Sequence, residues 1–538
     1  MKKQLTAISV LILLTGTSVM GQNVSTDPLI VSKDHAIVNT EYGKVRGYTN
    51  NGIFTFKGIP YAKAERFMVA QKPDSWQGIR SSMSYGPVAY TDETHMVNDE
   101  IEFPFQHNWG YRNEDCLSLN IWTQKINDGK KRPVMVWLHG GGFTAGSSME
   151  LPSYDGENLA KNDDVVLVSI NHRLNVLGFL DMTAYGEKYK GSENVSITDM
   201  ISALQWVKDN IAAFGGDPSN VTIFGQSGGG GKVTTLMSAP AAQGLFQKAI
   251  VQSGSYLING FVNKALAERV SAAVLKEFNL QPSQADSLLK VPYEELNAAS
   301  KRAIAKVQKE WTAEGKEGSF GWGPVLDGEL LPYQPDQPEA LALSKDIPLL
   351  VGSTKNEFTP FNPTLRNLTM DKVKADLQAK YGDKAQAYMA AVDKAYPGAK
   401  DPSNYVDLDI DFRLFSIRQA DVKSASSSAP VYMYMFNWQS PVLDGVYKAM
   451  HCMELGFVFD NIGRTREMTG GGAQAEALAD KMSKAWTNFA KTGNPNHDGL
   501  PNWPAYSSAN GSTMIFDNVS EVKNHYDKEL LDIASGKR

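Results

Sequence analysis

The chain has 538 residues, of which 42% are hydrophobic and 21% charged, a composition typical of a folded globular enzyme and not of a disordered or fibrous protein. Its formal net charge is −6 and it has no basic stripe that would neutralise phosphates, so we expect no nucleic-acid partner. The eight histidines and two cysteines fall in no metal-binding spacing, so we expect no metal site.

The N-terminal residues have the pattern of a cleavable secretion signal. Lys2 and Lys3 precede a short apolar run over residues 5–14, and small and polar residues follow up to Gly21. The run is too short to span a bilayer comfortably, and no later segment is apolar enough to do so. We therefore expect a signal peptide over residues 1–21, a mature chain that is secreted or periplasmic, and no stable membrane anchor.

Strand-like and helix-like runs alternate along the rest of the chain. The predicted strands are residues 134–138, 165–168, 221–224, 349–351 and 431–436, and the predicted helical segments are residues 199–214 and 263–307. The first two strands are apolar on both faces, which is typical of buried parallel strands. The alternation favours an α/β fold with a large, mostly parallel central sheet flanked by helices. Because no repeat or Pro/Ser-rich linker interrupts it, we expect a single domain over residues 22–538.

The sequence G-Q-S-G-G at residues 225–229 places Ser227 directly after a predicted strand and before a predicted helix. A strand, a sharp turn and a helix form the setting of a nucleophile elbow, in which the flanking glycines avoid collisions and permit strained backbone angles. The alternative is an ordinary Gly-rich helix start without chemistry. A phosphate-binding loop does not fit, because Gln226 stands where a Gly is required and Val233 where Ser or Thr is required.

A second Gly-rich segment, H-G-G-G-F at residues 139–143, follows the predicted strand 134–138 directly. Acyl transfer places negative charge on the former carbonyl oxygen, and preorganised backbone N–H groups stabilise that charge. Glycines let the backbone approach a substrate closely, so the segment predicts oxyanion donors. A plain Gly-rich turn is the alternative.

The chain resembles the type-B carboxylesterase/cholinesterase family, and the resemblance covers nearly its whole length. The matching motifs are G-I-P-Y-A at 58–62, E-D-C-L-S-L-N at 114–120, the long run over 203–218, P-V-L-D-G at 324–328 and T-G-N-P-N at 492–496. The resemblance implies an α/β-hydrolase fold and a secreted bacterial carboxylesterase of the p-nitrobenzyl-esterase type.

The resemblance also implies the rest of the catalytic machinery. The family's acid falls in V-G-S-T-K-N-E-F, which gives Glu357, and its histidine precedes an E-L-x-F-V-F-like stretch, which gives His451. The order Ser227, Glu357, His451 is the order of α/β-hydrolases, and a serine hydroxyl needs such a base and carboxylate. The implied oxyanion donors are the backbone amides of Gly141, Gly142 and Gly228.

Five further residues match family positions around the triad or its acyl pocket: Gln226, Ser253, Glu454, Phe320 and Trp322. For Phe320 and Trp322, ordinary core packing is an equal alternative. Gln226 stands where the family usually has Glu. It removes a negative charge and argues against a cationic choline ester. Gly228 stands where Ala is usual, so we expect a slightly looser elbow.

The predicted reaction is ester hydrolysis by two-step acyl transfer on a small-molecule ester, without a cofactor. One alternative is a catalytically silent, cholinesterase-like binding or adhesion protein, although such relatives lack triad members. The other is a triad hydrolase that prefers amides, thioesters or lipids, because the pocket chooses among acyl substrates. No expectation about the oligomeric state follows from the sequence.

Overall fold

The computed structural model describes residues 28–91, 99–255, 260–318, 320–398 and 401–536, and the predicted signal peptide lies outside the described residues. The strands are β1 Ile37–Thr40, β2 Gly43–Arg46, β3 Tyr48–Asn50, β4 Ile53–Pro60, β5 Ile79–Ser81, β6 Ser118–Thr123, β7 Arg132–Leu138, β8 Val166–Ile170, β9 Gly216–Gln226, β10 Lys248–Gln252, β11 Val262–Asn263, β12 Val325–Leu326, β13 Leu349–Thr354, β14 Val431–Phe436, β15 Ser512–Phe516 and β16 Glu521–Asn524. The α-helices are α1 Asp99–Phe105, α2 Glu157–Asp163, α3 Asn175–Phe179, α4 Val195–Asn210, α5 Gly228–Met237, α6 Lys264–Glu277, α7 Tyr293–Ala313, α8 Pro338–Leu343, α9 Met370–Tyr381, α10 Ala385–Ala395, α11 Ile410–Ser426, α12 Leu455–Val458, α13 Arg466–Thr469, α14 Ala473–Thr492 and α15 Lys528–Ala534.

An eleven-stranded sheet organises the fold, in the order β16-β15-β14-β13-β10-β9-β7-β8-β6-β4-β3. The strands from β8 to β15 are parallel, and antiparallel pairs lie at both ends of the sheet. The predicted α/β fold with a mostly parallel central sheet is therefore confirmed. Two small sheets, β1-β2-β5 and β11-β12, lie outside it.

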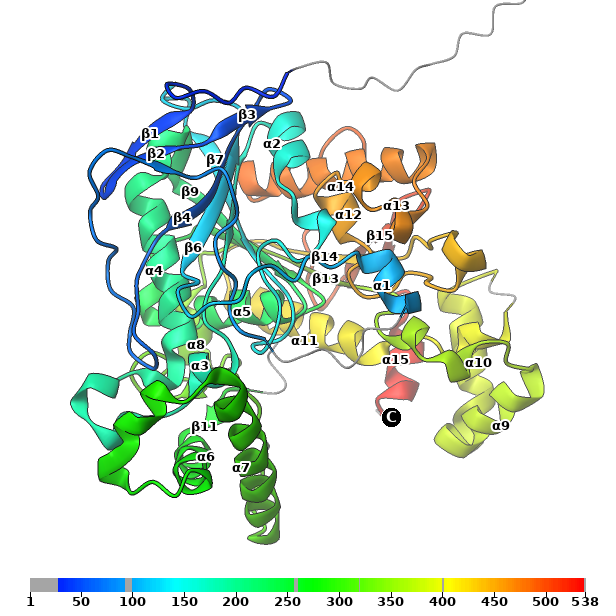
Figure 1. The fold of residues 1–538 in the computed structure, drawn as a ribbon. Coiled ribbons are helices and arrows are strands. Elements are labelled where there is room, and N and C mark those ends of the chain that lie inside the picture. Colours follow the sequence, from blue (N-terminus) through cyan, green and yellow to red (C-terminus); the bar gives the residue numbers. More distant parts are fainter. Residues whose placement is uncertain (1–27, 92–98, 256–259, 319, 399–400, 537–538) are drawn as a thin grey trace, which may run out of the picture.

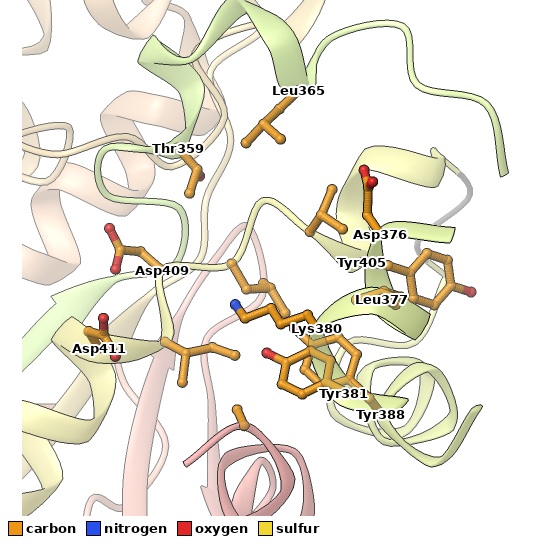
Figure 2. A pocket seen from close by; sticks show the side chains of 14 residues that line it. Thr359, Leu365, Asp376, Leu377, Lys380, Tyr381, Tyr388, Tyr405, Asp409 and Asp411 are labelled. Carbon is orange, nitrogen blue, oxygen red and sulfur yellow. The ribbon is translucent and has the colours of Figure 1, made fainter. Parts of the chain in front are cut away.

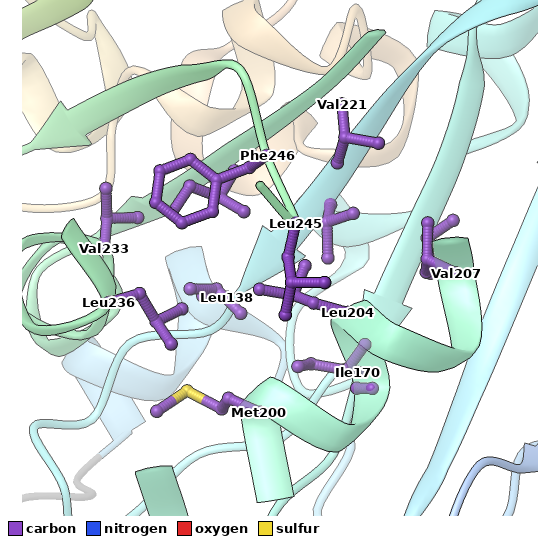
Figure 3. Packing of buried hydrophobic residues seen from close by; sticks show 14 of the residues in the cluster. Leu138, Ile170, Met200, Leu204, Val207, Val221, Val233, Leu236, Leu245 and Phe246 are labelled. Atoms are coloured by element: carbon purple, nitrogen blue, oxygen red, sulfur yellow. The ribbon is translucent and has the colours of Figure 1, made fainter. Parts of the chain in front are cut away.

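Side chains of the central strands alternate between two hydrophobic cores. On β7, Val134 and Val136 join the core beneath α4 and α5, whereas Met135 and Trp137 join the core beneath α14. Figure 3 shows the first of these cores, with Leu204 of α4 close to Leu138 and neighbouring strand residues. Both faces of the sheet are covered, which explains why the central strands have no polar face.

The predicted elements differ from the observed ones mainly at their ends. The helix expected over residues 199–214 is α4, which begins earlier, and a 3₁₀ turn over Ile211–Phe214 follows it. The strand expected over residues 221–224 lies within β9, which extends further at both ends. This strand begins at Gly216 because Gly216 already pairs with Arg132 of β7. Residues 431–436 were predicted with the right bounds.

The predicted helical segment over residues 263–307 contains α6 and α7, which lie side by side at the lower left of Figure 1. They have a hydrophobic cluster of their own, which also includes residues of α3. Among the helices of the described residues, none combines the length and the hydropathy that a membrane crossing requires.

A buried ion pair ties the loop after β8 to α4. The Arg173 guanidinium donates to both carboxylate oxygens of Asp199, at 2.8 and 2.6 Å, and its remaining nitrogen donates to the carbonyl oxygens of Glu65 and Met68. Both side chains are almost fully buried. Removing one partner would leave the other charge without compensation.

We predict that Asp199→Asn lowers the free energy of unfolding by about 3–5 kcal/mol, because the buried guanidinium loses its counter-charge. A urea titration followed by tryptophan fluorescence measures the change. Asp74→Asn is the matched control, since it breaks the exposed Lys63–Asp74 pair and is expected to cost below about 1 kcal/mol. Equal losses in the two variants would contradict the role of the buried pair.

Candidate active site

Ser227 lies at the turn between β9 and α5, so the predicted strand–turn–helix arrangement is present. Its backbone angles, φ 57° and ψ −126°, are strained for a residue with a side chain. The Ser227 N–H donates to the Gln252 carbonyl at 2.8 Å, and the Ser227 carbonyl accepts from the Gly231 N–H at 3.1 Å. These bonds hold the strained turn and leave the Ser227 side chain partly exposed.

Glycines allow this turn to pack directly against the end of β7. A methyl group at Gly229 would lie 2.0 Å from the Leu138 carbonyl oxygen, and one at Gly228 would lie 2.3 Å from backbone atoms of Gly142. That Gly228 loosens the elbow stays a prediction, and the structure shows what lies beside this residue. Its missing side chain leaves the space that Gly142 occupies.

Hydrogen bonds hold the carbonyl groups of the glycine loop, residues 139–143, which follows β7. The Gly140 carbonyl accepts from Nδ1 of His139 at 2.9 Å, and the Gly141 carbonyl accepts from the Ala145 N–H at 2.9 Å. These two peptide groups carry the N–H groups of Gly141 and Gly142. Because each carbonyl has a partner, the plane of each peptide is held in one orientation next to the elbow.

Glu357 and His451 come together behind the elbow. Nδ1 of His451 donates to the Glu357 carboxylate, which also accepts from the Ser253 hydroxyl at 2.7 Å and from the Thr354 N–H at 2.8 Å. Glu357 is fully buried and His451 nearly so. Since a carboxylate can only accept here, the proton on neutral His451 lies on Nδ1, which leaves Nε2 as the basic nitrogen.

Backbone hydrogen bonds align the two loops that carry this pair. The His451 N–H donates to the Glu357 carbonyl at 2.8 Å, and the Asn356 N–H donates to the Ala449 carbonyl at 3.1 Å. Glu357 itself has a positive φ of 38°. As at Ser227, a strained residue is held in place by bonds from a neighbouring segment.

Aromatic and amide groups enclose the His451 imidazole. Phe358 stacks on it at 4.2 Å between ring centroids, and Phe412 contacts it at 5.7 Å. The Gln226 side-chain nitrogen lies 3.1 and 3.3 Å from the two ring nitrogens. An atom nearly equidistant from both nitrogens lies over the ring face and not in line with either lone pair, so Nε2 stays available.

Gln226 also connects the Glu357–His451 pair to the elbow, because it contacts His451 and directly precedes Ser227. Among the described residues the Ser227 hydroxyl makes no direct hydrogen bond to His451. In enzymes without substrate, catalytic hydrogen bonds are often long and tighten only in the complex. Both partners are nonetheless on segments that backbone hydrogen bonds hold in place.

Cys452 follows His451 but does not resemble a nucleophile. Its thiol donates to the Gln226 side-chain oxygen at 3.3 Å, and burial raises the pKa of the thiol well above its ordinary value. A thiol that stays protonated is a poor nucleophile. Both Cys116 and Cys452 are free.

Glu454 is a second buried carboxyl group near the pair. It accepts from the Gln252 side-chain amide at 3.3 Å, and burial together with the Glu357 carboxylate raises its pKa to about 8. Glu454 is therefore mostly protonated at neutral pH. Two neighbouring buried carboxylates repel each other, which favours the protonated form of Glu454.

Phe320 and Trp322 form an edge-to-face pair, with 5.0 Å between ring centroids, against the cluster of α6 and α7. Within the described residues, no hydrogen bond or ring contact joins them to Ser227, Glu357 or His451. The aromatic residues that do contact His451, Phe358 and Phe412, were missed. The only sequence signal for Phe358 was its position directly after Glu357.

A cavity of about 390 Å³ lies near the Glu357–His451 pair and is lined in part by Thr359, two residues after Glu357 in the chain. Figure 2 shows Thr359, Asp409 and Asp411 on one side of it and Tyr381 and Tyr388 on the other. Burial and the nearby Glu357 carboxylate raise the pKa of Asp409 to about 6. Within the described residues, no group of three or more His, Cys, Asp or Glu side chains is arranged to hold a metal ion.

The raised pKa of Glu454 predicts a pH-dependent stability. Between the ordinary carboxyl pKa of 4.5 and about 8, the folded state binds more protons than the unfolded state, so stability falls as pH rises. Glu454→Gln is neutral in both states. We expect it to gain stability relative to the wild type by up to about 1.4 kcal/mol per pH unit within this window.

Urea midpoints of the wild type and Glu454→Gln at several pH values measure this difference. Glu310→Gln, at an exposed position of α7, is the control and should follow the wild type at every pH. A constant difference between Glu454→Gln and the wild type would show that Glu454 is ionised across the range.

Comparisons with known proteins agree over nearly the whole chain. The model of the Carboxylesterase family matches residues 34–534. The chain is 36% identical over 508 residues to para-nitrobenzyl esterase of Bacillus subtilis (strain 168), covering 92% of this chain and 97% of that protein. It is 33% identical over 500 residues to cocaine esterase of Homo sapiens, covering 85% and 82%.

Solved structures show the same relationship. An esterase from Clostridium hathewayi superposes with a TM-score of 0.83 at 36% identity, covering 94% of this chain and 99% of that one. A carboxylesterase from Geobacillus stearothermophilus superposes with a TM-score of 0.72 at 37% identity, covering 92% and 99%. The resemblance found in the sequence is confirmed: the chain belongs to the carboxylesterase family, has the α/β-hydrolase fold and is a carboxylic ester hydrolase.

Proposed function

We propose that Ser227, His451 and Glu357 are the catalytic triad of this ester hydrolase. The buried hydrogen bond between the Glu357 carboxylate and Nδ1 of His451 carries the proposal, because it directs the basic nitrogen away from the carboxylate. Ser227 is the nucleophile, on a turn that lifts its hydroxyl from the sheet. A silent binding protein is disfavoured, since all three side chains are present.

In the acylation step, Nε2 of His451 takes the proton of the Ser227 hydroxyl while the Ser227 oxygen attacks the ester carbonyl carbon. The tetrahedral intermediate collapses by breaking the bond to the alcohol oxygen, which leaves with the proton from Nε2. In the second step, water gives a proton to Nε2 and attacks the acyl-enzyme. The carboxylic acid leaves and Ser227 regains its proton. Glu357 stabilises the imidazolium in both steps and stays ionised.

The N–H groups of Gly141, Gly142 and Gly228 are the proposed oxyanion donors. The contact between Gly228 and Gly142 brings the helix start and the glycine loop to one place, and the bonded carbonyls of the loop hold its peptides in orientation. Preorganised donors of this kind contribute about 10²- to 10³-fold each to turnover.

Uncharged small-molecule esters of aromatic or arylalkyl alcohols are the substrates we propose. Phe358 and Phe412 next to His451 offer apolar ring surface where the leaving alcohol must take its proton, and Phe358 is 43% exposed. Gln226 brings no negative charge that would attract a cationic alcohol. The printed names of two relatives are consistent, one a para-nitrobenzyl esterase and one an esterase that hydrolyses aliphatic aromatic polyesters.

Residues 1–21 are proposed to be a signal peptide that directs the chain to the periplasm or outside the cell. The mature chain from residue 22 is proposed to form one catalytic domain. The family match over residues 34–534 supports the second proposal, because a single family model accounts for these residues.

The proposed triad predicts that Ser227→Ala lowers kcat for p-nitrophenyl esters by at least about 10⁴-fold, because no other hydroxyl replaces the nucleophile. The wild type should react with a fluorophosphonate probe, and Ser227→Ala should not. Ser219→Ala, an exposed position on the same strand β9, is the control and should keep both properties.

Assays with esters of increasing acyl length, benzyl and phenyl alcohols, and matched amides and thioesters complete this test. An unlabelled wild type or an active Ser227→Ala variant would reject the proposed nucleophile. A profile dominated by amides, thioesters or long-chain lipids would keep the triad and reject the substrate class.

The proposed oxyanion site predicts that Gly229→Ala lowers kcat by about 10-fold or more, because its methyl group would lie 2.0 Å from the Leu138 carbonyl oxygen and would displace the glycine loop that follows Leu138. The KM should change little, since ground-state binding needs no oxyanion donor. Gly463→Ala, where a methyl group meets open space, is the control for the same substitution. Wild-type kcat in Gly229→Ala would contradict the close contact with Leu138.

A further inference from the structure

Lys232 is a buried lysine behind the proposed oxyanion site. It lies in the second turn of α5, its side chain has no exposed surface, and its Nζ donates to the His139 carbonyl oxygen at 2.8 Å. Among the described residues no carboxylate lies within ion-pair distance of it. Burial lowers the pKa of this amine to about 7, with Glu150 the nearby opposing charge. A buried amine without a paired charge is costly, which calls for an explanation.

The bonded carbonyl belongs to the first residue of the glycine loop. His139 in turn donates through Nδ1 to the Gly140 carbonyl at 2.9 Å, and its ring stacks on His172 at 5.0 Å. The peptide that carries the Gly140 carbonyl also carries the Gly141 N–H. Lys232 is therefore two hydrogen bonds away from a proposed oxyanion donor.

The loop needs such an anchor because its glycines have no side chains to pack. Gly141 and Gly142 have φ values of +83° and +61°, and glycine has the widest choice of backbone conformations. An anchor must therefore act on the backbone. Lys232 does so from within α5, which begins at Gly228. The same helix therefore provides the Gly228 N–H donor and the anchor for the N–H groups of Gly141 and Gly142.

We propose that Lys232 is a positioning residue that holds the His139 carbonyl and thereby keeps the N–H groups of Gly141 and Gly142 directed at the oxyanion. This inference rests on the proposed function of those amides. Lys232 touches no reacting atom and acts through the loop. Its amine donates in both protonation states, so the anchor persists if the proton is lost.

A second buried lysine offers a matched control. Lys423 on α11 is 2% exposed, and its Nζ donates to the carbonyl oxygen of Ser344, directly after α8. Burial lowers its pKa to about 8. The two lysines share burial and a carbonyl partner, but only Lys232 bonds to the glycine loop.

The test compares Lys232→Met, Lys232→Gln and Lys423→Met in the full chain, with thermal midpoints, kcat and KM for a p-nitrophenyl ester. Met and Gln have similar lengths, and only Gln keeps a donor. We expect Lys232→Met to lose about 10- to 100-fold in kcat with KM within about threefold of wild type. Affinity for a trifluoromethyl ketone, which forms the oxyanion, should fall by a similar factor. Lys232→Gln should recover part of the loss.

Lys423→Met should keep wild-type kcat even where its thermal midpoint falls as far as that of Lys232→Met. Wild-type kcat in Lys232→Met, or equal kcat losses in Lys232→Met and Lys423→Met, would overturn the inference. If Lys232→Met does not fold, Lys232→Gln takes its place: a kcat loss of threefold or more at unchanged KM supports the anchor, and wild-type kcat overturns it. Failure of the proposed function is seen separately, as an active Ser227→Ala variant.

Discussion

The geometry of this site depends on a contact between two backbones. Because β7 and β9 are parallel neighbours, the segments that follow them leave the sheet at the same edge. The turn at Gly228 and Gly229 meets Gly142 and Leu138 closely, and a methyl group at Gly229 would lie 2.0 Å from the Leu138 carbonyl oxygen. A contact between backbones does not vary with side-chain rotamers. The amides on both sides are therefore placed more precisely than side chains would be.

Two members of the proposed triad have strained backbones, and neighbouring segments hold them in place. Ser227 and Glu357 both have positive φ, at a cost of about 1–3 kcal/mol each. Gln252, the last residue of β10, accepts from the N–H of Ser227, and the N–H of His451 donates to the carbonyl of Glu357. Both turns lie over a sheet whose faces are covered by separate hydrophobic cores, which gives the rigidity that such strain requires.

The buried ionisable groups around the site have different roles. Three donors face the Glu357 carboxylate, and hydrogen bonds are stronger in a medium of low dielectric constant. Glu454 stays protonated beside it, so His451 faces a single negative charge. Lys232 supplies a donor to the glycine loop from the opposite side.

The sequence by itself determined the α/β sheet, the turn around Ser227 and the glycine segment after β7, because these follow from patterns between residues that are close in the chain. It identified Glu357 and His451 only by family resemblance, since a single charged or aromatic residue in a loop has no periodicity. Only the tertiary structure decided how closely residue 228 approaches Gly142 and what Lys232 contacts. Their partners lie far away in the chain, and contacts between distant segments depend on how the strands and helices pack.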